Sequence, residues 1–162
     1  MTLPAEIDLV GVDPEDMHTL RLSWRHDDDH GYVFFNNYQR KRRMDAHNGV
    51  TLEGRCKEAP VEFPKLDLLP GSYGFFPYHF REEDGELLSA NATPLCRLRG
   101  EDGTSCVVFY GDWDPAFVWK DEKHFPVLHL DRECALQAWK VTLDRGYLIL
   151  SDDYVWEEDG KL

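Results

Sequence analysis

The sequence contains no long apolar run, and this absence excludes a membrane-spanning helix. A helix that crosses a bilayer needs about 20 consecutive apolar residues, and no stretch of the 162-residue chain comes near that length. The first eight residues also lack the basic start and apolar run of a signal peptide. No membrane partner is expected. A cytoplasmic location is slightly favoured, although a signal on a longer parent polypeptide would leave the location open.

Basic residues are scarce. The chain has 18 Lys and Arg residues against 31 Asp and Glu residues, and its formal net charge is -13. Such a field repels phosphate groups, so nucleic acid is not expected as a partner. The basic run at 40–43 is expected to pair with acids of the same chain. The acidity itself is explained by solubility, and it also suits a basic protein partner.

Cysteines are few and badly spaced for metal or redox chemistry, because none stand in C-x-x-C spacing. A two-residue hairpin loop at 102–103 would set Cys96 opposite Phe109. The same loop would set Cys106 opposite Arg99, so the two sulfur atoms would be out of register for a disulfide. Free thiols are expected for all members of the set, which are Cys56, Cys96, Cys106 and Cys134.

Turn residues recur at short intervals, and short runs of aromatic and β-branched residues lie between them. This spacing is typical of an all-β sandwich or barrel. The turn signals are Asp27–Gly31, Asn48-Gly49, Pro70-Gly71, Asp84-Gly85, Asp102-Gly103, Asp144–Gly146 and Asp159-Gly160.

Apolar patterning predicts the strands between these turns. Leu20, Leu22 and Trp24 alternate with polar residues, as in a half-buried strand. Residues 32–35 are apolar on both faces, which predicts a central strand. Pro77 cannot donate to a strand ladder and is expected to place the end of its strand at an edge or bend. The expected strands cover 20–24, 32–35, 50–52, 73–76, 95–98, 106–110, 117–119, 127–130 and 147–150.

One short helix is expected near 131–141. Asp131 can cap it, because a carboxylate accepts the free N–H groups of a first helical turn. Ala135, Ala138, Trp139 and Thr142 would share one face. No repeat or low-complexity tract interrupts the chain, so residues 1–162 are interpreted as one β-rich domain, with 1–17 as an extended or linker segment.

No catalytic, cofactor or metal site is predicted. The acidic stretch 27–30 lacks the spaced oxygen ligands and distal glutamate of a calcium loop, and a polar hairpin tip explains it. His26 and His30 have helical metal-site spacing but lie in a turn. No serine or cysteine has a nucleophile-elbow context. The acids lie in runs that are typical of solvated surface, notably Glu82, Glu83, Asp84, Asp112, Asp114, Asp152 and Asp153.

Carbohydrate contact is the binding hypothesis that the aromatic residues suggest. Aromatic rings stack on the apolar faces of sugar rings, while neighbouring amides and carboxylates bind the hydroxyls. Core packing is the competing explanation for the same aromatic residues, and a β-sandwich uses them that way more often. The candidate residues are Tyr38, Tyr110, Trp113 and Trp119, with Asn37 and Asp112, or Asp114, as polar partners.

Several segments, in order along residues 18–162, resemble the region that follows the catalytic barrel in bacterial β-galactosidases of glycoside hydrolase family 35. Phe76 stands where that family usually has Trp, and Tyr78 stands where it has Phe, so the match is loose at these positions. The segments that carry the resemblance are 31–40, 43–44, 46–47, 49–50, 69–80, 87–96, 107–110, 115–118, 135–140, 148–152 and 158–162.

The resemblance implies an antiparallel, jelly-roll-like β-sandwich that is a non-catalytic accessory domain. The family's catalytic glutamates lie on the barrel, and no position here matches them. The implied partners are the catalytic barrel of a parent chain and a galactoside or glycan. Two alternatives stay open: a stand-alone acidic module of the inhibitor or immunity type, and a small self-sufficient glycosidase, which requires two carboxyls facing across a cleft. An exposed apolar face favours the accessory domain, and a clustered acidic face favours the acidic module.

Overall fold

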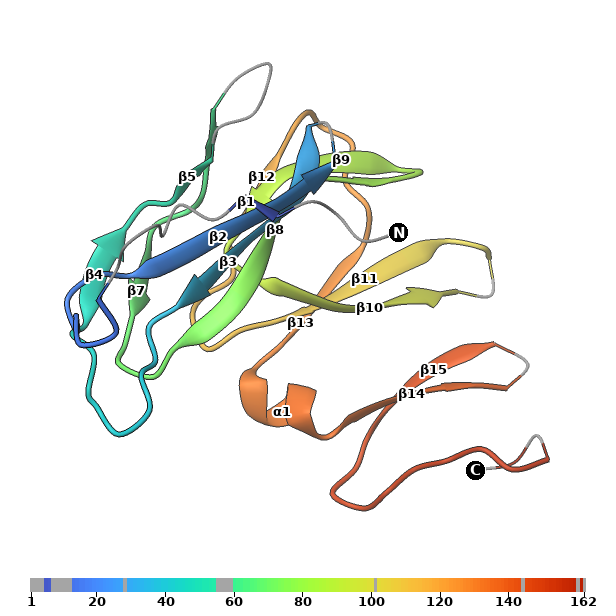
Figure 1. Ribbon diagram of the computed structural model, residues 1–162. Helices are drawn as coiled ribbons and strands as arrows, with labels where there is room; N and C mark the ends of the chain where they lie inside the picture. Colours follow the sequence, from blue (N-terminus) through green and yellow to red (C-terminus); the bar gives the residue numbers. More distant parts are fainter. Residues whose placement is uncertain are drawn as a thin grey trace.

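The computed structural model describes residues 5–6, 13–27, 29–54, 60–100, 102–143, 145–159 and 161. The fold is mainly β with one short helix, and its antiparallel sheets form a sandwich-like arrangement, as the sequence predicts (Figure 1). Most of the segment predicted as extended or linker, 1–17, lies outside the described residues.

The main sheet, within the described part of the chain, has six strands in the order β1-β2-β3-β8-β9-β12. Each neighbouring pair in it is antiparallel. The predicted central position of the strand at 32–35 is confirmed, because β3 lies between β2 and β8. The strands are β1 (Ala5–Glu6), β2 (Arg21–Asp27), β3 (His30–Asn36), β8 (Tyr73–Glu82), β9 (Gly85–Ala90) and β12 (Phe117–Trp119).

Smaller sheets complete the sandwich. In the order β10-β11-β13, β11 pairs antiparallel with β10 and parallel with β13. The other pairs are β4 with β7, β5 with β6, and β14 with β15. These elements are β4 (His47–Val50), β5 (Glu53–Gly54), β6 (Val61–Glu62), β7 (Leu66–Leu68), β10 (Thr93–Arg99), β11 (Ser105–Tyr110), β13 (Val127–Leu130), α1 (Arg132–Leu136), β14 (Ala138–Thr142) and β15 (Gly146–Leu150).

The first core lies between one face of β2, β3 and β8 and the segment that carries β4 to β7. Val33 and Phe35 of β3 are buried there, whereas Tyr32 and Phe34 alternate with them and are only partly buried. This alternation follows from the two-residue period of a strand. The buried members are Trp24, Val33, Phe35, Leu52, Val61, Phe63, Leu66, Leu68, Phe76 and Tyr78.

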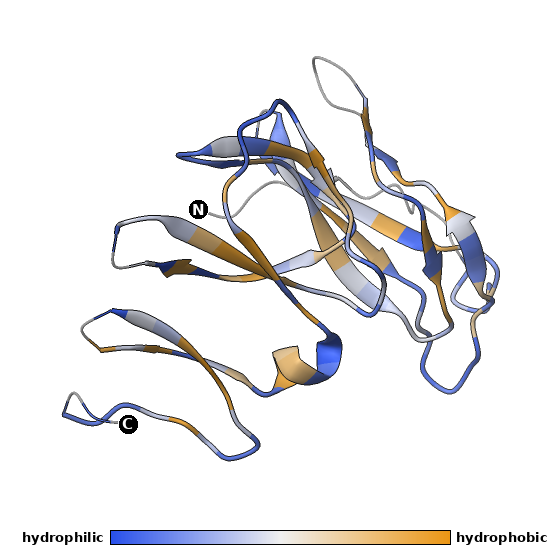
Figure 2. Cartoon of the chain, turned by 180° about the vertical axis from the view of Figure 1, so that it is seen from behind, coloured by the Kyte–Doolittle hydropathy of each residue, from blue (hydrophilic) through white to orange (hydrophobic). Residues whose placement is uncertain are grey.

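The second core lies between the main sheet and the sheet of β10, β11 and β13. Leu87 of β9 and Phe109 of β11 are fully buried in it. Figure 2 shows hydrophobic residues on the strands that face one another here. The buried members are Leu87, Ala90, Ala92, Val107, Phe109 and Phe125, with Phe80, Phe117 and Trp119 packed against them.

The predicted helix at 131–141 is too long. Asp131 does cap a helix, since its carboxylate accepts a hydrogen bond from the Cys134 N–H at 2.7 Å. The helix ends at Leu136, and residues 138–142 form β14 instead. Pairing with β15 overrides the helical spacing of apolar residues, because each residue of β14 finds a cross-strand partner there.

The prediction for Pro77 is wrong, because β8 continues through it to Glu82. Residues 73–78 of β8 pair with β3, and pairing with β9 begins at Tyr78. Pro77 therefore lies directly before the point where the second ladder starts. A proline is tolerated inside this strand because the strand changes partners at that position.

The predicted register of the β10–β11 hairpin is also wrong. Cys96 pairs with Val108, not Phe109, and Arg99 pairs with Ser105, not Cys106. The loop is longer than two residues because the Gly100 N–H donates to the Thr104 carbonyl at 2.8 Å. The thiols of Cys96, Cys106 and Cys134 are free, as predicted. Cys56 lies outside the described residues.

Candidate functional site

The second face of β2, β3 and β8 carries aromatic and arginine side chains in register. Ser23, Phe34 and Phe75 form a central cross-strand row. The rows on either side of it are Arg21–Asn36–Tyr73 and Arg25–Tyr32–Pro77. Because side chains alternate between faces along a strand, the residues of these rows lie opposite the first core.

Aromatic rings form the floor of this face. The rings of Phe34 and Phe75 have centroids 5.3 Å apart, and Tyr32 meets Phe75 edge-on at 5.5 Å. Above them lies a groove of about 900 Å³, hereafter the aromatic groove. It is lined by Arg21, Leu22, Ser23, Phe34, Phe35, Asn36, Tyr38, Tyr73, Gly74 and Phe75.

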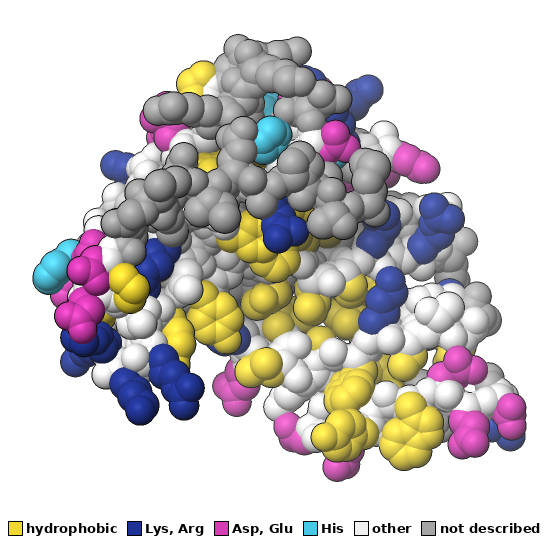
Figure 3. All heavy atoms as spheres, viewed as in Figure 1, with side chains coloured by type: hydrophobic (Ala, Val, Ile, Leu, Met, Phe, Trp, Pro, Cys, Tyr) yellow, Lys and Arg dark blue, Asp and Glu magenta, His cyan; other side chains and the backbone are white. Residues whose placement is uncertain are grey.

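The aromatic groove continues into two smaller hollows. A hollow of about 450 Å³ shares Phe34 and Phe75 with it and reaches Leu95 of β10. Another, of about 240 Å³, shares Tyr73 and extends to Leu136 of α1. Figure 3 shows hydrophobic side chains gathered in a hollow on this side of the molecule, with Lys and Arg side chains beside them. The apolar surface is therefore continuous from β2 to α1.

Arginines border the apolar surface. The Arg25 guanidinium lies 5.9 Å from the Phe34 ring centroid, and the Arg132 guanidinium lies 5.0 Å from that of Tyr73. Both distances suit cation–π attraction. Arg132 also donates to the Tyr73 hydroxyl at 3.0 Å. Positive charge thus lies next to the groove, although the chain as a whole is acidic.

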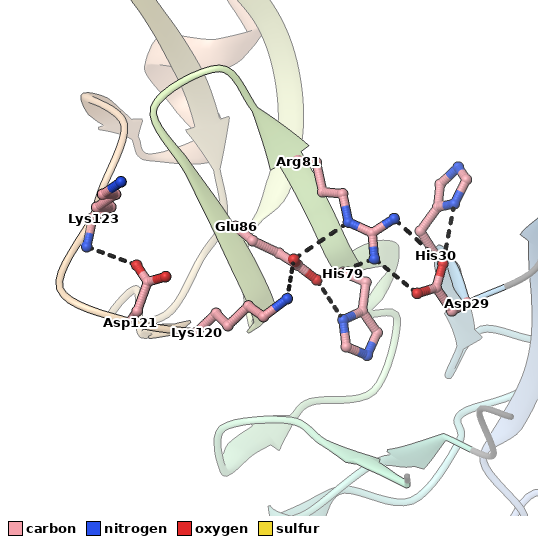
Figure 4. A network of polar contacts seen from close by, with 8 residues as sticks. All are labelled: Asp29, His30, His79, Arg81, Glu86, Lys120, Asp121 and Lys123. Carbon is pink, nitrogen blue, oxygen red and sulfur yellow. Dashed lines mark hydrogen bonds and ion pairs between the residues drawn. The ribbon is translucent and has the colours of Figure 1, made fainter. Parts of the chain in front are cut away.

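A polar network joins the β2–β3 turn to the β8–β9 hairpin and the end of β12 (Figure 4). Glu86, whose side chain is 12% exposed, is its centre. It accepts from His79 Nδ1 at 2.8 Å and from Lys120 Nζ at 2.8 Å, and it pairs with Arg81 Nε at 3.3 Å. Arg81 also donates to Asp29 at 2.7 Å. One carboxylate therefore ties four segments together.

The network determines the charge state of Glu86. Burial raises the pKa of this carboxyl, but the hydrogen bonds from Lys120, His79 and Arg81 outweigh burial and lower it to about 2. The Arg81 guanidinium likewise lowers the pKa of Asp29 through its hydrogen bonds. Both carboxyls are therefore ionised at neutral pH, so neither can donate a proton to a substrate.

His79 has a left-handed backbone conformation, with φ of 48° in the middle of β8. Non-glycine residues adopt this region at a cost and persist there only when their surroundings hold them. Here the hydrogen bond to Glu86 supplies that restraint. The network thereby helps to hold a strained residue of β8 in place.

Three of the predicted sugar-contact residues have structural roles. Asn37 is fully buried and donates to the Asp45 and Leu69 carbonyls at 2.8 and 3.0 Å. The Trp113 ring packs against Phe35 and Phe76, at the edge of the first core. Trp119 packs against the second core, where its ring stacks on His124 with centroids 4.5 Å apart.

The other three lie at the surface. Tyr38 is 51% exposed and lines one end of the aromatic groove. Tyr110 lines the hollow beside α1, and the exposed Asp112 lies 3.4 Å from Arg132 at its edge. The structure therefore does not bring the six predicted residues together in one site. Sugar contact at Tyr38 or Tyr110 stays a prediction.

The sequence alone does not reveal the groove, because its floor is open or covered according to which segments pack on each face of the main sheet. The signals were present: Arg21 and Ser23 alternate with apolar residues, and residues 32–35 are apolar on both faces. Which face of the sheet remains open depends on where residues 50–54 and 60–68 pack, and no local sequence pattern shows their position. The polar network was missed as well, since it depends on the pairing of Arg81 with Glu86.

The acidic stretch at the β2–β3 turn forms the tip of a hairpin. Asp27 and His30 pair across the β2–β3 turn, as the hairpin prediction requires; Asp28 lies outside the described residues. Within the described ranges, no cluster of three or more His, Cys, Asp or Glu side chains is arranged to bind a metal ion. No helix in the part of the chain that the structure describes is long and apolar enough to span a bilayer.

Comparison of the chain with protein-family models, with curated proteins and with solved structures finds no match. The geometry provides an open apolar groove bordered by arginines and a carboxylate network without an available proton. This arrangement suits binding.

Replacing Glu86 with Gln is expected to reduce stability by about 1–3 kcal/mol at pH 7, since it removes a charged acceptor and leaves three donors poorly satisfied. The sign of the pH dependence follows from the lowered pKa of Glu86, about 2 against 4.5 in the ordinary state. Its contribution is complete above pH 4.5 and disappears as the pH falls through about 2.

Urea unfolding at pH 7, 4.5 and 2.5 measures this difference. The difference in the free energy of unfolding between the wild type and Glu86→Gln should become smaller as the pH falls. Glu83→Gln, an exposed neighbour in the β8–β9 turn, is the matched control and should leave stability nearly unchanged. If this difference in the free energy of unfolding stays constant across these pH values, the network does not stabilise the fold through the charge of Glu86.

Proposed function

We propose that this chain is a non-catalytic accessory domain of a longer glycoside hydrolase of the β-galactosidase type, and that its role is structural. In this proposal the aromatic groove docks against the catalytic barrel of the same polypeptide. The observation that carries the proposal is the groove, an apolar hollow of about 900 Å³ on the main sheet. An exposed apolar surface that polar residues border marks a site of interaction.

The chemistry of the groove favours a protein partner over a sugar. Its centre consists of Phe34 and Phe75, which offer no hydrogen-bonding groups. Oriented polar groups are needed to bind the hydroxyls of a sugar. The row Arg21–Asn36–Tyr73 and the nearby Tyr38 supply most of them at one end of the groove, and Ser23 adds a single hydroxyl in the central row. Weak glycan contact in this proposal is therefore limited to that end.

The order of the sequence segments supports the same proposal. The resemblance to family 35 β-galactosidases runs through residues 18–162, and it assigns the catalytic glutamates to a barrel that precedes this region. An accessory domain at that place in the chain needs a surface that contacts the barrel. The aromatic groove has the apolar character of such a surface.

The state of the acids argues against a self-sufficient glycosidase. A general acid for glycoside cleavage needs a raised pKa. Every described carboxyl whose pKa departs from its ordinary value has it lowered, because hydrogen bonds favour the charged form; these are Asp16, Asp29, Glu86, Asp102 and Asp131. Glu82, with a side chain only 7% exposed, pairs with Arg97.

The groove also weighs against the alternative of an acidic module for a basic partner. Arg21 and Arg25 belong to the same face as the aromatic rings. They would repel a basic surface at the place where the apolar area is largest.

The isolated chain is expected to show no turnover of a chromogenic galactoside, whereas the complete polypeptide from the full coding region hydrolyses it. The reason is that the proposed proton donor and nucleophile lie outside this chain. Turnover by the isolated chain that a single Asp or Glu substitution abolishes would contradict the proposal. So would a coding region without a barrel beside this segment.

Phe34→Ser combined with Phe75→Ser is expected to loosen the docking of this domain in the complete polypeptide. Each ring should contribute about 1–2 kcal/mol to the interface. Limited proteolysis should cut between the domains faster in this variant. Val118→Ser, on the exposed edge strand β12, is the control and should leave the cleavage rate unchanged. Thermal unfolding of the isolated variant checks that the fold survives.

A further inference from the structure

Arg21, which lines the aromatic groove, and Arg25, which borders it on the same face, lack a carboxylate partner among the described residues. Arg25 is exposed, and its guanidinium lies over the Phe34 ring. Arg21 donates to the carbonyl oxygens of Asp16 at 3.2 Å and Tyr38 at 3.4 Å. These contacts hold the Arg21 side chain without neutralising its charge.

Some of the other described arginines have acidic partners. Arg81 pairs with Asp29 and Glu86, and Arg97 pairs with Glu82. The chain has 31 acids, so carboxylates are abundant. No acid lines the aromatic groove. The positive charge of the groove is therefore a local feature of its lining.

An apolar partner placed over this groove would remove water from Arg21 and Arg25. A charge that loses its water without gaining a partner costs several kcal/mol. A partner that also supplies carboxylates avoids this cost, because arginine forms strong, directional hydrogen bonds with carboxylates. The groove therefore selects for a surface that combines apolar side chains with acids.

We propose that the aromatic groove binds an acidic, apolar polypeptide surface whose carboxylates pair with Arg21 and Arg25 while its apolar side chains cover Phe34 and Phe75. The proposal rests on the proposed function in one respect, namely that the groove is a docking surface. It adds the chemistry of the partner. A neutral glycan leaves the arginines unpaired.

Two end-blocked synthetic peptides test the proposal with the chain itself. One alternates Asp with Phe and Tyr, and the other has Lys in place of every Asp. Fluorescence anisotropy of the labelled peptides against the full 162-residue chain gives both affinities. The acidic peptide should bind at least roughly tenfold more tightly. Its affinity should fall as NaCl rises from about 0.05 M to about 0.5 M, because salt screens exposed charge pairs.

Arg25→Glu should weaken binding of the acidic peptide by roughly tenfold or more and improve binding of the basic one. The matched control is Arg99→Glu, which introduces the same charge change at an exposed position of β10, away from the β2–β3–β8 face that carries Arg25. It should leave both affinities close to those of the wild type. Thermal unfolding of each variant separates a lost contact from a lost fold.

Equal affinity for the two peptides, or no binding of either, would overturn the inference. An equal loss in Arg99→Glu would also overturn it, since the effect would then come from net charge. The groove could be covered in the complete polypeptide although the acidic and basic peptides bind with equal affinity. In that case the proposed acidic character of the partner is wrong, and the proposed function stands. The acidic peptide could bind more tightly than the basic one although the groove stays uncovered in the complete polypeptide. In that case the proposed function is wrong and the inference stands.

Discussion

The structure depends on one constraint: β3 and β8 are apolar on both faces, and the chain's own core buries only one of them. Val33 and Phe76 are fully buried on the covered face. Burial of such side chains contributes about 1.5–3 kcal/mol each and drives the sandwich together. On the other face, Phe34 and Phe75 are only partly buried. A fold that leaves aromatic rings open on its main sheet has a surface suited to a partner.

Charge is distributed in a way that agrees with this division. The acid-rich surface keeps the chain soluble, and ion pairs such as Arg81 with Glu86 and Arg97 with Glu82 connect strands. The network around Glu86 joins the far end of β8 to the β2–β3 turn. It thereby supports the register that aligns Phe34 with Phe75 in the groove.

The fold class was predictable because turn residues and apolar alternation are local signals. The hairpin of β2 and β3 and the cap at Asp131 follow from such signals. The length of α1 did not, since β15 draws residues 138–142 into a strand. The short strands β5, β6 and β7 and the strands β9 and β14 were missed because their patterns are brief or are overridden by tertiary pairing.

The candidate site was less predictable than the fold. Aromatic residues that look alike in sequence divide into core and surface only after the sheets pack. Trp113 packs against the first core, whereas Tyr38 lines the groove. The sequence therefore identified residue types suited to binding, but the floor of the groove, Phe34 and Phe75, emerged only from the strand register.

Hydroxyl-radical footprinting of Phe34, Tyr73 and Phe75 tests the central idea most directly. The oxidation rates of these side chains are compared between the 162-residue chain and the longer polypeptide of the proposed function, with the exposed Tyr154 as internal reference. A covered groove predicts strong protection of the three groove residues in the complete polypeptide and none of Tyr154. Equal oxidation rates in the two forms would contradict the account.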